Sequence, residues 1–168
     1  TKLNTMPNPP KILAPETAAI WNAPDYIDAL SAADKSNIYG WAHHLYGWNL
    51  GTNPDNAIGW MDYFAWLYND KPRFQTEFSD DDHTSTHQAC MDLATLMHNS
   101  LTVEEVSAYL YWELTWNAQG RGLINFGYAN WVKNPIYYAF KHYSAFTDPN
   151  WQRIETSTND YPDLRISA

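Results

Sequence analysis

The chain has 168 residues, of which 45% are hydrophobic and 17% charged, a composition typical of one globular domain with a sizeable core. Its net charge of −9 argues against nucleic acid or an anionic membrane surface as the main partner, because both require basic patches. The single cysteine, Cys90, excludes an internal disulfide, and no apolar run is long enough to span a membrane.

The hydrophobic pattern predicts strands and helices in alternation. In chain order these are a strand over 11–17, a helix over 25–33, a strand over 38–46, a helix over 54–68, a strand starting at residue 73, a helix over 86–99, a strand over 107–114 and a helix over 135–144. An acidic loop, 80–82, is expected after the third strand, and a glycine-rich loop after the fourth.

Repeated βα units of this length predict parallel strands, in an open sheet or in a barrel. No glycine-rich phosphate loop follows a strand, which disfavours a nucleotide-binding sheet. The polar and aromatic residues concentrate at the downstream strand ends, where (β/α)8 barrel enzymes carry their active sites. Since a full barrel needs eight units, we expect residues 1–147 to form half of one, and the period-two pattern of 148–168 to begin a β-rich side domain.

Glu77 is the best candidate for a catalytic carboxylate. Strict alternation along the third strand would place it on the same face as Gln75, with Phe74, Thr76 and Phe78 on the other. A carboxylate on so apolar a strand must be paired or take part in chemistry, because an unpaired buried charge is costly. The alternative to catalysis is a structural ion pair with Arg73 or a helix terminus.

The neighbouring strand ends offer further candidates. His44 and Tyr46 end the second strand, while His43, on its opposite face, is better explained as a core histidine. Trp112 and Trp116 end the fourth strand, and a tryptophan face can stack on a sugar ring.

A second carboxylate, which glycoside hydrolysis requires, is harder to find. Glu113 and Glu16 are the internal candidates, and neither has strong support. Thr102 and Glu105 read as a capping box, so Glu104 and Glu105 are assigned to a helix start rather than to a site. The histidines and aspartates match no familiar metal-ligand spacing, so neither a metal nor another cofactor is expected.

Several segments resemble glycoside hydrolase family 30. Residues 42–47 (Ala-His-His-Leu-Tyr-Gly), 75–77 (Gln-Thr-Glu) and 108–112 (Ala-Tyr-Leu-Tyr-Trp) resemble the sixth, seventh and eighth barrel strands of that family. Residues 13–16 (Leu-Ala-Pro-Glu) resemble its fifth strand, and 137–154 its last barrel helix and the start of its side domain.

The resemblance implies the C-terminal half of a retaining glycosidase, with Glu77 as nucleophile. The acid/base glutamate lies in that family in an Asn-Glu-Pro motif after the fourth strand, and no such motif occurs here. His44, Tyr46 and Trp112 would shape the sugar subsite, with Trp116 close by. Thr115-Trp116-Asn117 stands where glucuronoxylan-specific members carry an arginine, and Arg121 follows further along the loop.

The resemblance also implies partners and a location. The expected substrate is the β-1,4-xylan of plant cell walls, the expected partner the N-terminal half of the barrel, and the expected location extracellular. Two alternatives stay open: a non-catalytic half-barrel that only binds polysaccharide, and a family member that acts on a β-linked glucan or galactan.

Overall fold

The computed structural model describes residues 5–80, 86–117, 121–127, 130–156 and 164–168. Most of the expected acidic loop, 80–82, lies outside them. The elements are β1 (Leu13–Thr17), η2 (Ile20–Asn22), α1 (Ala23–Ala29), α2 (Ala32–Asn37), β2 (Gly40–His44), η3 (Pro54–Ala57), α3 (Ile58–Leu67), β3 (Arg73–Glu77), α4 (His87–Thr102), β4 (Ala108–Tyr109), β5 (Thr115–Asn117), β6 (Ile124–Phe126), β7 (Trp131–Lys133) and α5 (Pro135–Ser144).

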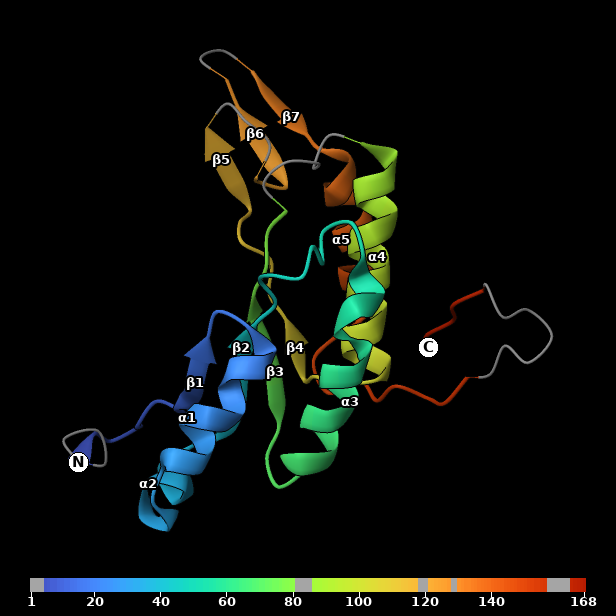
Figure 1. Ribbon diagram of the computed structural model, residues 1–168. Helices are drawn as coiled ribbons and strands as arrows, with labels where there is room; N and C mark the ends of the chain where they lie inside the picture. The colour runs from blue at the N-terminus through green and yellow to red at the C-terminus, as the bar shows by residue number, and fades with distance from the viewer. Residues whose placement is uncertain (1–4, 81–85, 118–120, 128–129, 157–163) are drawn as a thin grey trace.

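The first four strands form one parallel sheet in chain order, β1-β2-β3-β4. Helices connect successive strands, as Figure 1 shows, so the prediction of four βα units of the (β/α)8-barrel type is confirmed. Because all four strands run the same way, their carboxyl ends meet along one edge of the sheet. That edge is where the candidate site residues should gather.

Local chemistry accounts for most helix boundaries. Helix α4 begins after Thr86, whose hydroxyl accepts a hydrogen bond from the amide of Ala89, and α5 begins at Pro135 as predicted. The helix expected over 25–33 is instead divided into α1 and α2. Leu30 is extended, and Ser31 caps a new helix by accepting from the amide of Asp34. A side-chain cap inside an apparently continuous pattern therefore starts a second helix.

The main core lies between the sheet and its helices. Alternate residues of β2 and the position after it, Trp41, His43 and Leu45, are at most 1% exposed, and Met61 and Phe64 of α3 are fully buried. Burying side chains of this size is the main stabilising contribution to such a fold, at about 25 cal/mol per Å2 of apolar surface. Helix α5 adds a polar tie to α4, because Tyr143 donates to the carbonyl of Ala94 over 3.1 Å.

The fourth strand is much shorter than the pattern over 107–114 predicts. Only two residues form β4, although the chain keeps following β3: the amides of Leu110 and Trp112 donate to the carbonyls of Gln75 and Phe78. The expected glycine-rich loop contains a second sheet, β5-β6-β7, which stands apart from the parallel sheet at the top of Figure 1. This small sheet is consistent with a side domain beside the barrel units.

Residues 148–168 contain no assigned strand within their described part, contrary to the period-two pattern. The two described parts of this region, 148–156 and 164–168, nevertheless meet, since the amide of Ile154 donates to the carbonyl of Ala168 over 2.7 Å. The proposed domain boundary at residue 147 stays a prediction.

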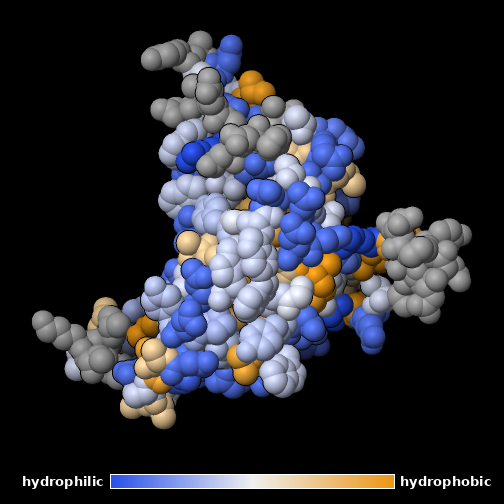
Figure 2. Space-filling view, viewed as in Figure 1, coloured by the Kyte–Doolittle hydropathy of each residue, from blue (hydrophilic) through white to orange (hydrophobic). Residues whose placement is uncertain are grey.

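The hydropathy of the surface is that expected of a globular domain with this composition. In the view of Figure 2 it is mainly hydrophilic or intermediate, and strongly hydrophobic residues appear only in small patches. Among the described residues, no helix has the length and apolar character that crossing a bilayer requires.

Candidate functional site

The carboxyl ends of β1, β2 and β3 bring Glu16, His44 and Glu77 together. Glu16 and Glu77 lie on either side of the His44 ring: Glu16 Oε2 is 3.1 Å from Nε2, and Glu77 Oε1 is 3.7 Å from Nδ1. All three side chains are partly exposed, by 39% for Glu16, 19% for His44 and 26% for Glu77. The three side chains are therefore accessible to solvent, and their contacts with one another hold them in place.

Two register shifts aim these side chains. On β1, Pro15 is opposite Ala42 and Thr17 is opposite His43, so Glu16 is an extra residue, with φ of 61°. Such a bulge bends the strand and redirects side chains, and bulges are common next to active sites.

The second shift lies on β3. Gln75 is opposite His43 and Glu77 is opposite His44, so Thr76 is the extra residue. The expectation that Glu77 shares a face with Gln75 is therefore wrong. Gln75 is fully buried, with Oε1 accepting from the amide of Leu110, whereas both Thr76 and Glu77 reach the His44 cluster. Strict alternation failed because the bulge adds one residue between the two.

Glu77 has a hydrogen-bond donor at the site. The hydroxyl of Tyr46 donates to its Oε1 over 3.0 Å and lies 3.5 Å from the hydroxyl of Ser79. The alternative ion pair between Glu77 and Arg73 does not form. Arg73 instead donates to the carbonyl of Glu104 over 2.7 Å and contacts the carboxylate of Glu105 at 3.4 Å.

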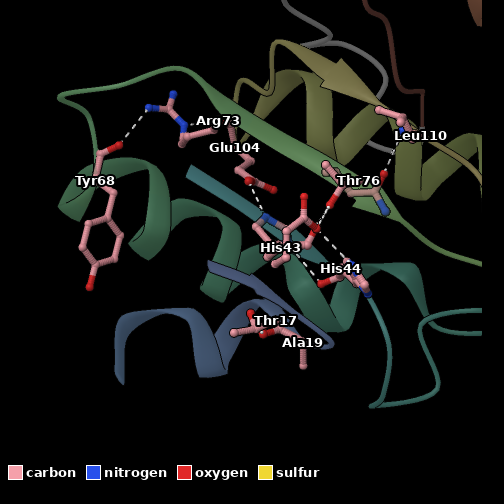
Figure 3. Close-up of polar contacts among 11 residues, drawn as sticks. Thr17, Ala19, His43, His44, Tyr68, Arg73, Thr76, Glu104 and Leu110 are labelled. Carbon is pink, nitrogen blue, oxygen red and sulfur yellow. Dashed lines mark hydrogen bonds and ion pairs between the residues drawn. The ribbon is translucent and has the colours of Figure 1, made fainter. Parts of the chain in front are cut away.

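Glu104 is the largest departure from the sequence prediction. Thr102 does not cap a helix start; it is the last residue of α4, and its hydroxyl donates to the carbonyl of His98. Glu104 is fully buried and lies 2.6 Å from Nε2 of His43, which is equally buried. Figure 3 shows His43 reaching toward Glu104, and the other ring nitrogen of His43, Nδ1, lies 3.0 Å from the carbonyl of His44. The strand pattern that starts at Ser107 left no room for a new helix, and was the available signal against the capping box.

The His43–Glu104 pair is structural, as predicted for His43. Burial by itself would lower the pKa of His43, but the adjacent Glu104 carboxylate outweighs it and raises the pKa above its ordinary value of 6.5. The pair ties β2 to the segment before β4, and so supports the strand that carries His44.

The aromatic candidates lie further along the edge. Trp112 is 45% exposed and is joined to the end of β3 through the carbonyl of Phe78. Trp116 belongs to β5 and is 37% exposed, and its ring centroid lies 5.9 Å from the Arg121 guanidinium carbon. Trp116 in β5 and Arg121 in the segment before β6 thus form a cation–π contact with each other.

The two weak carboxylate candidates separate in the structure. Glu16, which the sequence offered only as a weakly supported candidate at a strand end, is part of the cluster. Glu113 points one oxygen, Oε1, into the interior, where it has no hydrogen-bond partner among the described residues. A cavity of about 750 Å3 lies elsewhere, lined by the end of α4 and the C-terminal segment.

The chain is similar in structure to parts of larger glycoside hydrolases. A GH30 endoxylanase from Clostridium papyrosolvens C71 matches with a TM-score of 0.64 and 20% identity, covering 88% of this chain and 35% of that one. The catalytic domain of GH30 xylanase C from Talaromyces cellulolyticus matches with a TM-score of 0.65 and 19% identity, and the match covers 88% of this chain and 34% of that one. An endo-β1,6-glucanase matches with a TM-score of 0.63 and 20% identity, and the match covers 82% of this chain and 32% of that one.

These matches confirm the predicted likeness to family 30 at the level of the fold. The chain spans about a third of the length of the structures it matches. By sequence, no protein-family model matches the chain and no curated protein does.

Proposed function

We propose that this chain is the part of a retaining glycoside hydrolase that carries the nucleophile, Glu77. The observation that supports this most is the setting of Glu77 at the carboxyl end of β3, accessible and held by the Tyr46 hydroxyl at 3.0 Å. In (β/α)8 enzymes the active site lies at this end of the strands. The similarity of the fold to GH30 hydrolases supports the same class of chemistry.

In the proposed mechanism the Glu77 carboxylate attacks the anomeric carbon of the sugar. The glycosidic C–O bond breaks as a carboxylic acid, located in a part of the protein other than this chain, donates its proton to the leaving oxygen. Water, deprotonated by the same group, then displaces Glu77 and restores its carboxylate. Retaining enzymes hold their two carboxyl groups about 5–5.5 Å apart.

We propose the N-terminal half of the barrel as the partner that supplies this acid. Parallel sheets are normally covered on both faces. Here Tyr39 and Leu110, beside β2 and β4, are 40% and 47% exposed. Four further strands would cover such residues and pair with the outer edges of β1 and β4 in the sheet that the described residues form. Native mass spectrometry of the purified protein should find these strands, on the same polypeptide or on a bound one; their absence from an active preparation would refute this.

As substrate we propose the β-1,4-xylan backbone, with His44, Tyr46 and Trp112 shaping the sugar subsite beside Glu77. Trp116 and Arg121 would contact the glycan further along. A β-linked glucan or galactan is the alternative, and the endo-β1,6-glucanase among the similar structures gives it weight. Since plant-wall polysaccharides lie outside cells, the proposal also carries an extracellular location. Product analysis on xylan, glucuronoxylan and a β-1,6-glucan discriminates among these substrates.

The test of the nucleophile is Glu77→Gln in the protein that contains this chain. We expect turnover to be lost while binding of xylooligosaccharides, measured by calorimetry, survives, because the amide keeps the shape but cannot form the glycosyl–enzyme bond. Asp62→Asn, at an exposed position of α3, is the matched control and should leave turnover unchanged. Full turnover in Glu77→Gln would remove Glu77 as nucleophile. Binding without turnover in the unsubstituted protein would favour the non-catalytic alternative.

A further inference from the structure

The mechanism above leaves one carboxylate of the cluster without a task. Glu16 is the extra residue of the β1 bulge. Its φ of 61° lies in the left-handed region, which residues other than glycine seldom adopt. Such a conformation costs free energy and persists only where the surroundings enforce it, most often at functional sites. The contacts of Glu16 are therefore informative.

One oxygen of Glu16 makes both of its contacts. Oε2 accepts a hydrogen bond from the hydroxyl of Thr76 over 2.6 Å and lies 3.1 Å from Nε2 of His44. Thr76 is itself the extra residue of the β3 bulge, and its hydroxyl also lies 3.1 Å from the carbonyl of His43. The two bulges thus meet at this carboxylate oxygen, and Figure 3 shows Thr76 and His44 turned toward the same region between the strands.

The His44 ring has one nitrogen for each carboxylate. A carboxylate accepts hydrogen bonds and cannot donate them, so Glu16 requires the proton of His44 to be on Nε2. The other nitrogen, Nδ1, then faces Glu77 at 3.7 Å. In histidines of this kind, the partner of one nitrogen decides the tautomer and the direction of the ring.

We propose that Glu16 is a positioning residue that keeps the proton of His44 on Nε2 and aims Nδ1 at Glu77. The inference rests on the proposed role of Glu77 as nucleophile. With the proton on Nε2, Nδ1 presents a lone pair to Glu77, so Glu16 acts by fixing the His44 ring, which limits the positions open to the Glu77 carboxylate while the Tyr46 hydroxyl donates to it. Fixed orientation matters because a nucleophile misplaced by a fraction of an ångström loses much of its rate advantage.

The test compares Glu16→Gln and Glu16→Asp in the protein that contains this chain, with Asp62→Asn as control. The first readout does not depend on activity: two-bond 1H–15N correlation spectra report which His44 nitrogen carries the proton. We expect the proton on Nε2 in the unsubstituted protein and in Glu16→Asp. In Glu16→Gln we expect a mixture of tautomers, because an amide can donate as well as accept.

The second readout is the rate at which a 2-deoxy-2-fluoro xylobioside with a dinitrophenolate leaving group labels Glu77, followed by intact mass. Glu16→Gln should slow labelling about 10- to 100-fold, the range produced by losing one charge-assisted hydrogen bond. Xylobiose affinity and thermal stability should stay close to those of the control, and Glu16→Asp should recover part of the rate.

The outcomes separate the two proposals. An unchanged His44 tautomer in Glu16→Gln, or a slower rate explained by lost stability, would overturn the positioning role. A probe that labels a residue other than Glu77 would overturn the nucleophile instead, while the spectra would still report on the contact between Glu16 and His44.

Discussion

At the scale of single residues, the environment of Glu77 depends on two neighbours from β2 and the turn after it. Tyr46 donates a hydrogen bond to one carboxylate oxygen, and His44 approaches the same oxygen at 3.7 Å. The Tyr46 hydroxyl stabilises a carboxylate whose negative charge is needed for attack, while the His44 ring restricts the position of that carboxylate. Cys90, in contrast, is a free, partly buried residue of α4 that packs against the core.

Tyr46→Phe should therefore lower kcat/KM about 10- to 100-fold, because hydrogen bonds to charged groups contribute about 1.5–3 kcal/mol. The matched control is Tyr63→Phe, which removes a hydroxyl from a side chain that is 42% exposed on α3. Steady-state kinetics on xylan or on an aryl xylobioside provide the measurement. Equal rates for Tyr46→Phe and the control would contradict the assigned contact.

At the scale of elements, the site depends on how β2 is held between its neighbours. The buried His43–Glu104 pair fixes the helix-facing side of the strand, and the Glu16–His44–Thr76 contacts fix its end. Arg73 adds to the same anchor by donating to the carbonyl of Glu104. Adjacent residues of one strand therefore serve a structural and a candidate functional task.

Glu104→Gln should be strongly destabilising, by about 3–5 kcal/mol, because it removes one partner of a buried ion pair. Since the pKa of His43 is raised in the folded state, the stabilisation is fully present below the unfolded value of 6.5. It is lost as pH rises through the higher folded-state pKa. The stability difference between the unsubstituted protein and the variant should therefore shrink from pH 6 to pH 9.

Urea unfolding at several pH values measures this difference. Glu105→Gln is the matched control, because Glu105 is the adjacent residue but is 61% exposed, and should cost about 1 kcal/mol or less. A difference for Glu104→Gln that stays constant or widens with pH would contradict a charged His43 in the folded state.

At the scale of the whole molecule, the C-terminal segment is fastened to the barrel units by Arg165. Its guanidinium donates to Asn99 of α4 over 2.8 Å and to the carboxylate of Asp55 in η3 over 2.6 Å. Partial burial would raise the pKa of Asp55, but the hydrogen bonds from Asn99 and Arg165 outweigh it and lower the pKa below 3.8. The ion pair between Arg165 and Asp55 should thus hold at neutral pH and weaken as the pH falls through the lowered pKa of Asp55.

Arg165→Ala should loosen residues 164–168 without unfolding the molecule. Because the pair is 38% and 53% exposed, we expect a cost of about 1 kcal/mol or less in global stability. Hydrogen exchange in 164–168 should become several-fold faster, with Lys35→Ala as a surface control. An exchange pattern identical to that of the control would show that other contacts hold the segment.

The sequence by itself determined the order of the βα units, the position of α5 and the burial of His43, and it predicted Glu77 as the candidate nucleophile. These features follow from short-range periodicity, caps and residue type, which act within a few positions of the chain. Only the tertiary structure decided the partners of Glu77, the burial of Glu104 and the place of Glu16. Each of these depends on a contact between residues about 30 to 60 positions apart, and on two bulges that shift the faces of β1 and β3 by one residue.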